Sequence, residues 1–467
     1  MLDAIEKTLK YTEKNSDYSE VRIENSENNK IIFKNGNVEI VDSTRTIGLC
    51  IRILKNGSLG AAFTNDFNSS KIKKTVNNAI KMANSSGKNL KKPTTLSKES
   101  VNKENYEVKE KIKLKNVTLE DKIKELVELD KDIVSTKLDI PARFFEFSDE
   151  IREKYYINSD GSFIHTKIPR VGIEYLISLV SNGSSQQRMF QLGGTGGWEV
   201  FKNWNLNERI ISETKTLSNV LKAKKSPKGI FDVVLSPELI GIASHESCGH
   251  PCEADRILGR EAAQAGESFI TKQMLGKRIG SEIVNLVDDP TLKSSYGFYL
   301  YDDEGVEANR RFLIKEGIIN TFLHNRETAS EFGVKSNASS RSSNWSYEPI
   351  VRMANTFVLP GNHNFDELID VKKGVYIKSY MEWNIDDKRF NQRYVGLEAY
   401  LITNGKIGSL IKRPVIELTT PILWHSIDAV GKDLDFTAGT CGKSEPMQGV
   451  PVWFGGPHVR LKNIRLG

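Results

Sequence analysis

Cysteine is scarce in this chain, with only four residues among 467: Cys50, Cys248, Cys252 and Cys441. So few cysteines in so long a chain exclude the disulfide framework that small secreted proteins use. Cys248, Cys252 and Cys441 lie in glycine- or histidine-rich contexts. In those contexts a role as metal ligand or catalytic group stays open.

Long hydrophobic runs are missing as well. No run approaches the roughly 20 apolar residues that a membrane span needs. The segment from Met1 to Asn15 is charged throughout and lacks the apolar core of a signal peptide. We therefore predict a cytoplasmic protein without a membrane partner.

A strong excess of one charge is also absent, because 66 Lys and Arg stand against 60 Asp and Glu, which gives a net charge of +6. That basicity is too dilute to indicate nucleic-acid binding, and the Lys-rich stretch from Lys71 to Lys124 is interleaved with acids. We predict no nucleic-acid partner. The length allows two or three domains with substantial cores.

The beginning of the chain reads as helices and hairpins. We expect an amphipathic helix over 2–14 and a closing helix over 68–84. Between them, Asn35-Gly36 and Asn56-Gly57 are typical hairpin turns. Short strands are predicted over 19–24, 30–34, 38–41, 44–54 and 59–64. The following segment, 86–116, is rich in Lys, Glu, Ser and Asn and reads as a linker or surface excursion.

The same order returns about 125 residues later, too long a period and too few copies for a solenoid. A helix over 119–134 precedes strands over 142–148 and 153–158, and a helix over 206–222 closes the block. We interpret this as an internal duplication. The alternative is that hairpin proteins resemble one another because Asn-Gly turns are common.

Gly193 to Gly197 form a glycine-rich segment before that closing helix. Such a loop could cradle a phosphate, but neither a following Lys-Ser/Thr nor a dinucleotide-binding spacing is present. We favour a backbone that must approach another part of the protein closely.

The predicted fold class is α+β, with a duplicated helix-plus-antiparallel-sheet region followed by a β-rich C-terminal domain whose sheet is curled or closed. The predicted domains are 1–117, 118–225 and 226–467. In the last domain, expected strands over 283–287 and 298–301 run into the acidic groups Asp288-Asp289 and Asp302-Asp303-Glu304. Paired carboxylates suit acid/base chemistry or a hard cation, but acids at strand ends are usually turn formers, which we favour.

The C-terminal domain opens with Ser236-Pro237-Glu238, a typical helix start. The helix leads into His245-Glu246-x-x-x-His250, whose histidines are five positions apart instead of the four of the common H-E-x-x-H zinc motif. On a straight helix they would point roughly 140° apart. A π-type widening would bring them together; alternatively, Gly249 ends the helix and His250 curls back. Two histidines that satisfy only local hydrogen bonds are the structural alternative.

Cys441 lies between glycines near the C-terminus, in Thr437-Ala438-Gly439-Thr440-Cys441-Gly442-Lys443. Such a cysteine can reach a metal or act as a nucleophile, or simply be a small buried residue. Joined to His245 and His250, it would complete the three protein ligands of a catalytic zinc site.

These motifs resemble the TldD/PmbA family, specifically its metal-bearing TldD branch, over nearly the whole chain. The resemblance rests on His245-Glu246-x-x-x-His250, Asp302-Asp303-Glu304-Gly305, Arg352-Met353-x-Asn355-Thr356 before Leu359-Pro360-Gly361, Glu398 to Ile402 before Asn404-Gly405-Lys406-Ile407, and Cys441-Gly442-Lys443.

The resemblance implies a cytoplasmic zinc-dependent peptidase that acts on unfolded or extended polypeptides. By position, His245, His250 and Cys441 match the family's zinc ligands, and Glu246 matches its catalytic glutamate. The family works as a dimer, so the implied partner is a second copy or a PmbA/TldE-like paralogue without the metal motif. An extended substrate would be held by added β pairing.

Two features depart from the family pattern. Ser379 to Trp383 replace a glycine-rich segment, and such bulky side chains could narrow a substrate channel. Cys248 could compete as a ligand or oxidise near the site.

Two rival functions stay open. One is a non-catalytic scaffold for peptides or partners with a structural zinc, in which Glu246 is dispensable. The other is a cysteine hydrolase that uses Cys441 with a histidine base and needs no metal.

Overall fold

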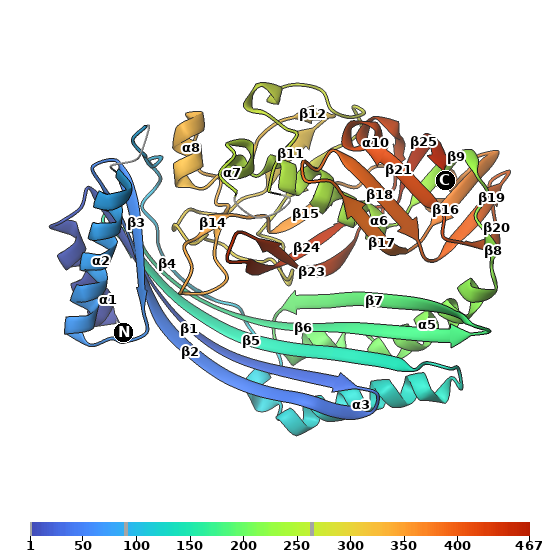
Figure 1. Cartoon of the computed structure of the whole chain (residues 1–467), viewed down its shortest axis with the longest axis horizontal. Helices are drawn as coiled ribbons and strands as arrows, with labels where there is room; N and C mark the ends of the chain where they lie inside the picture. The colour runs from blue at the N-terminus through green and yellow to red at the C-terminus, as the bar shows by residue number, and fades with distance from the viewer. Residues whose placement is uncertain (1, 88–91, 262–265) are drawn as a thin grey trace.

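The computed structural model describes residues 2–87, 92–261 and 266–467. In these ranges the chain is an α+β protein, as predicted, in which a long curved sheet from the N-terminal part lies beneath a β-rich C-terminal half (Figure 1). Helices α3 (Leu119–Ser135) and α5 (Leu206–Lys222) lie along the outer face of this sheet, and α1 (Leu2–Glu13) and α2 (Ser69–Gly87) lie at one end.

Four long strands make up most of the curved sheet: β1 (Tyr18–Lys34), β2 (Asn37–Lys55), β5 (Ala142–Asn158) and β6 (Phe163–Ser181). The sequence predicted pairs of shorter strands because polar runs interrupt the apolar pattern, and these lengths were wrong. The polar runs stay extended because their side chains find partners across the sheet. Ser26 donates to Glu150 at 2.7 Å and Asn29 donates to Asp149 at 2.8 Å.

The repeated order of elements is present in the structure. Helix, three strands and helix follow one another as α1, β1, β2, β3 (Ser58–Thr64) and α2, and again as α3, β5, β6, β7 (Ser184–Thr195) and α5, with the short α4 (Trp198–Lys202) inserted before α5. The two sets join where β1 pairs antiparallel with β5, so among the described residues they share one seven-stranded sheet. The boundaries at 117 and 225 therefore stay a prediction.

The segment 86–116 is more than a linker. Its residues 103–107 form β4 (Lys103–Glu107), which pairs parallel with the start of β6 at the edge of the sheet, and η1 (Leu114–Asn116) buries Leu114. Composition alone predicted no strand here, because the segment is polar. The strand forms because pairing with β6 supplies the stabilisation that the polar sequence lacks. Residues 88–91 of this segment lie outside the described ranges.

The C-terminal half contains two larger sheets and a small one among the described residues. In the order of their pairing, the largest contains β17 (Tyr380–Ile385), β18 (Asn391–Gly396), β21 (Val415–Thr419), β25 (Val459–Leu466), β9 (Gly229–Leu235), β16 (Lys373–Ile377), β19 (Ala399–Thr403), β20 (Lys406–Lys412) and β8 (Lys224–Lys225), with β22 (Ile427–Val430) beside β25. The second contains β12 (Ile318–Ile319), β11 (Arg311–Lys315), β10 (Leu286–Asp288), β15 (Asn355–Val358), β24 (Gln448–Gly456) and β23 (Asp435–Lys443). The small one pairs β13 (Ser340–Arg341) with β14 (Ile350–Val351).

Short helices complete this half: α6 (Pro237–Ser244), a π-helix (His245–Gly249), η3 (His250–Cys252), α7 (Ala254–Ile257), η4 (Lys272–Met274), α8 (Arg326–Phe332), α9 (Phe365–Ile369) and α10 (Thr420–Ser426). None of the described helices is long and apolar enough to cross a membrane. The predicted strand over 298–301 was wrong, since only Tyr301 makes an isolated bridge, with Glu307. The strand expected from 283 begins only at Leu286.

Helix α6 lies in the core of this half, with Leu239, Ile240, Ile242 and Ala243 all buried. The helix begins as predicted, because Ser236 is its N-cap and the Ser236 side chain accepts a hydrogen bond from the Leu239 N–H at 3.4 Å. Gly241 permits close contact with β24: a Cβ at this position would lie 2.9 Å from the Gly455 Cα. The helix is thereby packed tightly against the second sheet with its end held beside β23 and β24.

Candidate metal centre

The histidine motif forms a π-helix over His245–Gly249. The His250 N–H donates to the His245 carbonyl, five residues back, as a π-turn requires. The wider turn brings the two rings together, with centroids 4.8 Å apart. Of the two routes left open by the sequence, the π-type widening is therefore the one that occurs.

His245, His250 and Cys441 converge although Cys441 lies far away in the sequence. All three are buried, and their potential ligand atoms lie within 4.8 Å of one another. Cys441 is on β23, and its Sγ lies 3.5 Å from His250 Nε2. Among the described residues this is the one His/Cys/Asp/Glu group found with the geometry to hold a metal ion.

A buried carboxylate orients His250. Glu253 Oε2 lies 3.0 Å from His250 Nδ1, which leaves Nε2 facing Cys441. Arg256 donates to the same Glu253 oxygen at 2.6 Å, and Lys443 lies 3.3 Å from it. Carboxylates commonly fix metal-binding histidines in this manner. Sequence reasoning missed Glu253, although an acid three residues after His250 was a usable signal.

The surroundings favour the protonation states that bind metals. Burial lowers the pKa of His245, and it lowers the pKa of His250 to about 4, so both rings are neutral at pH 7. Burial alone would raise the pKa of Cys441, but His250 and Arg352 outweigh it and bring this pKa to about 7. Neutral imidazole and thiolate are the ligand forms that metals require.

The donor set fits zinc. Two imidazoles and one thiolate are typical ligands of a catalytic zinc site that keeps a fourth position open. In addition, Nδ1 of His245 is buried and has no hydrogen-bond partner among the described residues. Such an unpaired buried nitrogen is costly, and a bound metal would relieve this cost for the ring.

Glu246 follows His245 directly and faces a different partner. Its carboxylate forms a short ion pair with Arg389, in the turn between β17 and β18. Both side chains are largely buried, and Arg389 has a left-handed backbone with φ of 63°. Sequence reasoning missed Arg389, because nothing in a hairpin sequence indicates that its tip reaches a residue of the π-helix.

An open cleft adjoins these groups. A cavity of about 410 Å³ is lined by the cluster, by Glu246 and Arg389, by 189–191 of β7 and by 437–442 of β23. Tyr380 and Trp383, from the segment that departs from the family pattern, also line it. The cleft is lined by β7 of the curved sheet and β23 of the C-terminal half, and Figure 1 shows these two strands where the curved sheet meets the C-terminal half.

Arg352, the first residue of the Arg-Met-x-Asn-Thr motif, has a structural role beside Cys441. Its guanidinium donates to the carbonyls of Cys441 and Gln448, from β23 and β24, and so braces the hairpin that carries Cys441. The side chain is fully buried.

The other candidate groups have structural roles. Cys248 and Cys252 are buried in the hydrophobic core, and neither is part of the cluster found in the described residues. Burial raises the pKa of Cys248 well above its usual value, which makes it a poor ligand.

Asp302 holds a turn, as favoured from the sequence, because it accepts hydrogen bonds from the N–H groups of Glu304 and Val306. Asp288 instead lies within β10 and accepts hydrogen bonds from Ala354 and from Thr356 of the neighbouring strand β15. The glycine segment also behaves as expected. A Cβ on Gly193 would lie 2.7 Å from the Tyr296 ring, and Trp453 donates to the Gly193 carbonyl at 2.7 Å.

Comparisons with known proteins agree with this fold and site. Profiles of the PmbA/TldA metallopeptidase domain 1, central domain and C-terminal domain match residues 19–83, 112–220 and 228–467. A metalloprotease of Methanocaldococcus jannaschii is 34% identical over 460 residues, 98% of each chain. A zinc metalloprotease TldD homologue of Saccharolobus solfataricus is 27% identical over 354 residues, 75% of this chain and 77% of the relative.

Among solved structures, TldE from Thermococcus kodakarensis has a TM-score of 0.77 at 16% identity and covers 99% of this chain and 100% of its own. A putative modulator of DNA gyrase from Thermotoga maritima has a TM-score of 0.79 at 16% identity, and the match covers 100% of this chain and 99% of that protein. These two show the shared fold. Fold, site and relatives together define a metallopeptidase class. The chain belongs to the TldD/PmbA family.

Proposed function

We propose that this protein is a zinc-dependent peptidase that hydrolyses unfolded or extended polypeptides. The observation that carries the proposal is the convergence of His245, His250 and Cys441 in one buried cluster at the wall of an open cleft. In this proposal these three side chains hold the zinc, and Glu246 is the catalytic residue. The relative from Saccharolobus solfataricus that is named a zinc metalloprotease supports the choice of metal.

Zinc bound by this donor set would supply Lewis acidity, which polarises a peptide carbonyl and makes water more acidic at neutral pH. Glu246 lies at the same cleft. Its carboxylate would accept a proton from the attacking water and deliver it to the leaving amine. Glu253 would keep the His250 ring fixed while this occurs.

Arg389 would position the Glu246 carboxylate. A charge-assisted hydrogen bond of this kind fixes a side chain more firmly than a neutral one. Arg389 also lines the cleft, and its buried Nε has no hydrogen-bond partner among the described residues, so this donor would be available to a substrate carbonyl.

Extended polypeptides suit this cleft because strand edges border it. β7 and β23 are edge strands of their sheets within the described residues, and both line the cavity. The Gln191 side chain donates to Thr440 Oγ1 at 3.3 Å, which links the two edges. An unfolded segment could add to such an edge by backbone hydrogen bonds, whatever its sequence.

We also propose a dimer, either of two copies or with a PmbA/TldE-like paralogue. The family membership supports this assembly, and the TldE structure shows that such paralogues share the fold. Size-exclusion chromatography with light scattering, with and without the paralogue, would separate the two forms. A cytoplasmic location stays a prediction, which cell fractionation would test.

The test measures zinc content and cleavage of an unfolded polypeptide for the wild type and for Glu246→Gln. We expect about one zinc per chain in both and cleavage only by the wild type. If both hold zinc and neither cleaves, alone or with the paralogue, the protein is a scaffold with a structural zinc.

A cysteine hydrolase is favoured by one observation, the 3.5 Å contact between Cys441 and His250. That reading leaves His245 without a role. Cleavage that survives complete removal of metal by a chelator would establish it in place of the zinc peptidase.

A further inference from the structure

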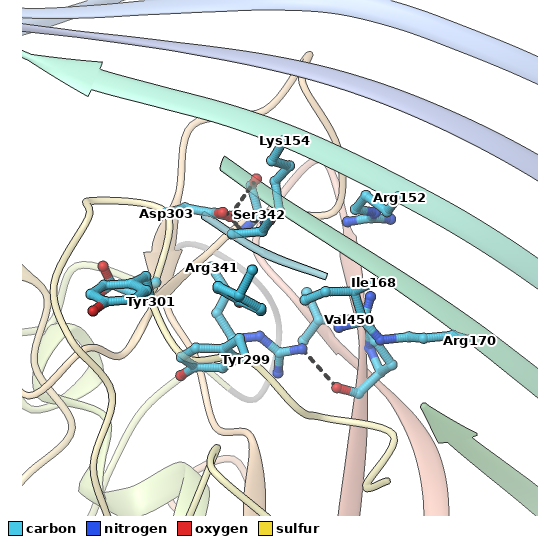
Figure 2. Close-up of a pocket in the computed structure, with 14 residues that line it drawn as sticks. Arg152, Lys154, Ile168, Arg170, Tyr299, Tyr301, Asp303, Arg341, Ser342 and Val450 are labelled. Atoms are coloured by element: carbon cyan, nitrogen blue, oxygen red, sulfur yellow. Dashed lines mark hydrogen bonds and ion pairs between the residues drawn. The ribbon is translucent and has the colours of Figure 1, made fainter. Parts of the chain in front are cut away.

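A second, smaller cavity lies between the curved sheet and the C-terminal half (Figure 2). Its volume is about 30 Å³, and none of the metal-cluster residues lines it. One wall comes from β4, β5 and β6, with Tyr106, Arg152, Lys154, Thr166 and Arg170. The facing wall comes from the C-terminal half and includes Tyr299, Asp303, Arg341 and Val450.

Positive charge exceeds negative charge around this cavity. Glu150 pairs with both Arg152, at 2.7 Å, and Arg170, at 3.9 Å. Asp303 likewise pairs with both Lys154 and Arg22.

Arg341 adds another cation. Of the carboxylates near this group, Glu24 contacts Arg152 at 3.8 Å, and burial raises the pKa of Asp302 well above its usual value, which favours its neutral form. Among the described residues, these five cations therefore have three carboxylates within ion-pair distance: Glu24, Glu150 and Asp303.

Arg341 is the one of these cations with no carboxylate within ion-pair distance in the described residues; Asp303 acts on it only from farther away, and its guanidinium lies over the Tyr299 ring at 5.3 Å. It is buried, with 7% of its surface exposed. Among the described residues it donates to the carbonyls of Met353 and Pro451, at 2.5 and 2.8 Å, so three of its five N–H donors remain available. Burial, opposed by Tyr299 and Asp303 and reinforced by Arg170 and Arg352, lowers its pKa to about 10. An uncompensated buried charge is strongly unfavourable.

Two hydroxyl groups add hydrogen-bond donors to the cavity wall. Thr166 Oγ1 is buried and has no hydrogen-bond partner among the described residues. Tyr106 is its cross-strand neighbour in the β4–β6 pair. The Tyr106 oxygen accepts from the Leu300 N–H at 3.1 Å, and burial raises its pKa to about 12, so its proton is retained for donation.

We propose that this cavity binds a small monovalent anion, which in the cell is chloride. The excess of cations and O–H donors excludes a metal ion. The volume excludes phosphate and sulfate, because about 10–15 Å³ already holds one water and a five-atom oxyanion needs several times that space. The anion compensates Arg341 and joins the curved sheet to the C-terminal half.

The site also reaches the hairpin that carries Cys441. Arg341 donates to the carbonyl of Pro451, Pro451 pairs with Thr440, and Val450 pairs with Cys441. Chloride thus stabilises the strand pair that holds one of the cluster residues. The inference does not depend on the peptidase proposal, since it requires neither zinc nor cleavage.

The test combines crystals grown in bromide with thermal unfolding in chloride and in gluconate at equal ionic strength. We expect a bromide anomalous peak beside Arg341 and Thr166. We also expect a saturable rise in Tm of roughly 1–3 °C in chloride over gluconate. Arg341→Met and the more conservative Thr166→Val should lose most of this difference. The control Arg45→Met, at an exposed arginine of β2, should keep it.

The proposal is overturned if bromide gives no peak in the cavity and the chloride and gluconate curves coincide. In that case the cavity holds only water. A Tm difference that persists unchanged in Thr166→Val and in Arg341→Met would place anion binding elsewhere and would equally overturn it.

Discussion

Arg389 is the side chain that controls the position of Glu246, because its guanidinium pairs with that carboxylate inside the cleft. We predict that Arg389→Gln lowers kcat about 10- to 100-fold, since a hydrogen bond to a charged group contributes about 1.5–3 kcal/mol. Zinc content should not change, because Arg389 contacts no residue of the cluster in the described hydrogen bonds and ion pairs. Arg389→Lys should restore part of the rate. Steady-state kinetics with metal analysis gives all three values.

Arg393 provides the matched control. It lies on the same hairpin, and its exposed side chain pairs with Glu382 outside the cleft. Arg393→Gln should leave both kcat and zinc unchanged. Equal losses in the two variants would mean that the hairpin matters only for stability.

At the scale of elements, the π-helix explains why this motif tolerates histidines that are five positions apart. Gly249 makes it possible, because a Cβ there would lie 1.9 Å from the Met353 sulfur, which is fully buried. We predict that Gly249→Ala destabilises the fold by about 1–3 kcal/mol through overpacking and weakens zinc binding. The measurements are urea unfolding and competition with a chelator dye.

A double-mutant cycle with Met353→Ala tests the cause. If overpacking against Met353 is responsible, the double variant should be more stable than the sum of the single effects. Gly408→Ala, in the exposed strand β20 with only ordinary contacts near its added Cβ, should change stability by less than about 0.5 kcal/mol. A simple sum of effects would contradict the proposed contact.

The sequence predicted the elements whose signals are local. Helix capping at Ser236 and the Asn-Gly turns were read correctly, because both depend on neighbouring residues; Asn35, Asn56, Asn182 and Asn404 all have positive φ. Polar runs inside β1 and the strand β4 were missed, because their partners lie on other strands far along the chain.

The same distinction holds within the site. The chain's own spacing allowed a π-turn or a capped helix end, and only the fold selects between them. The prediction that His245, His250 and Cys441 share one site came from the resemblance to the family. Arg389 could not be assigned, since its contact with Glu246 depends on distances across the fold, whereas Glu253, three residues after His250, was a local signal that went unused.

At the scale of the whole molecule, Asp303 ties the C-terminal half to the curved sheet. Its carboxylate contacts Arg22 at 3.1 Å and Lys154 at 2.6 Å, on β1 and β5. Burial opposes its ionisation, but Lys154 and Arg22 hold its pKa below the usual range. Asp303 therefore contributes stability that is fully present above about pH 4 and is lost as the pH falls further.

We predict that Asp303→Asn costs about 3–5 kcal/mol at pH 7, as expected for one partner removed from a buried ion pair. The gap to the wild type should shrink as the pH falls below about 4. Denaturant unfolding across this pH range measures it. Asp428→Asn, which removes a partly exposed ion pair with Arg460, should cost less than about 1 kcal/mol. A gap for Asp303→Asn that is constant with pH would contradict this account.

X-ray absorption at the zinc edge would show whether His245, His250 and Cys441 hold one zinc ion. We expect one sulfur at about 2.3 Å and two imidazole nitrogens at about 2.0–2.1 Å. The sulfur signal should disappear in Cys441→Ser and persist in Cys248→Ser. A protein without zinc, or a sulfur signal that depends on Cys248 instead of Cys441, would contradict this expectation.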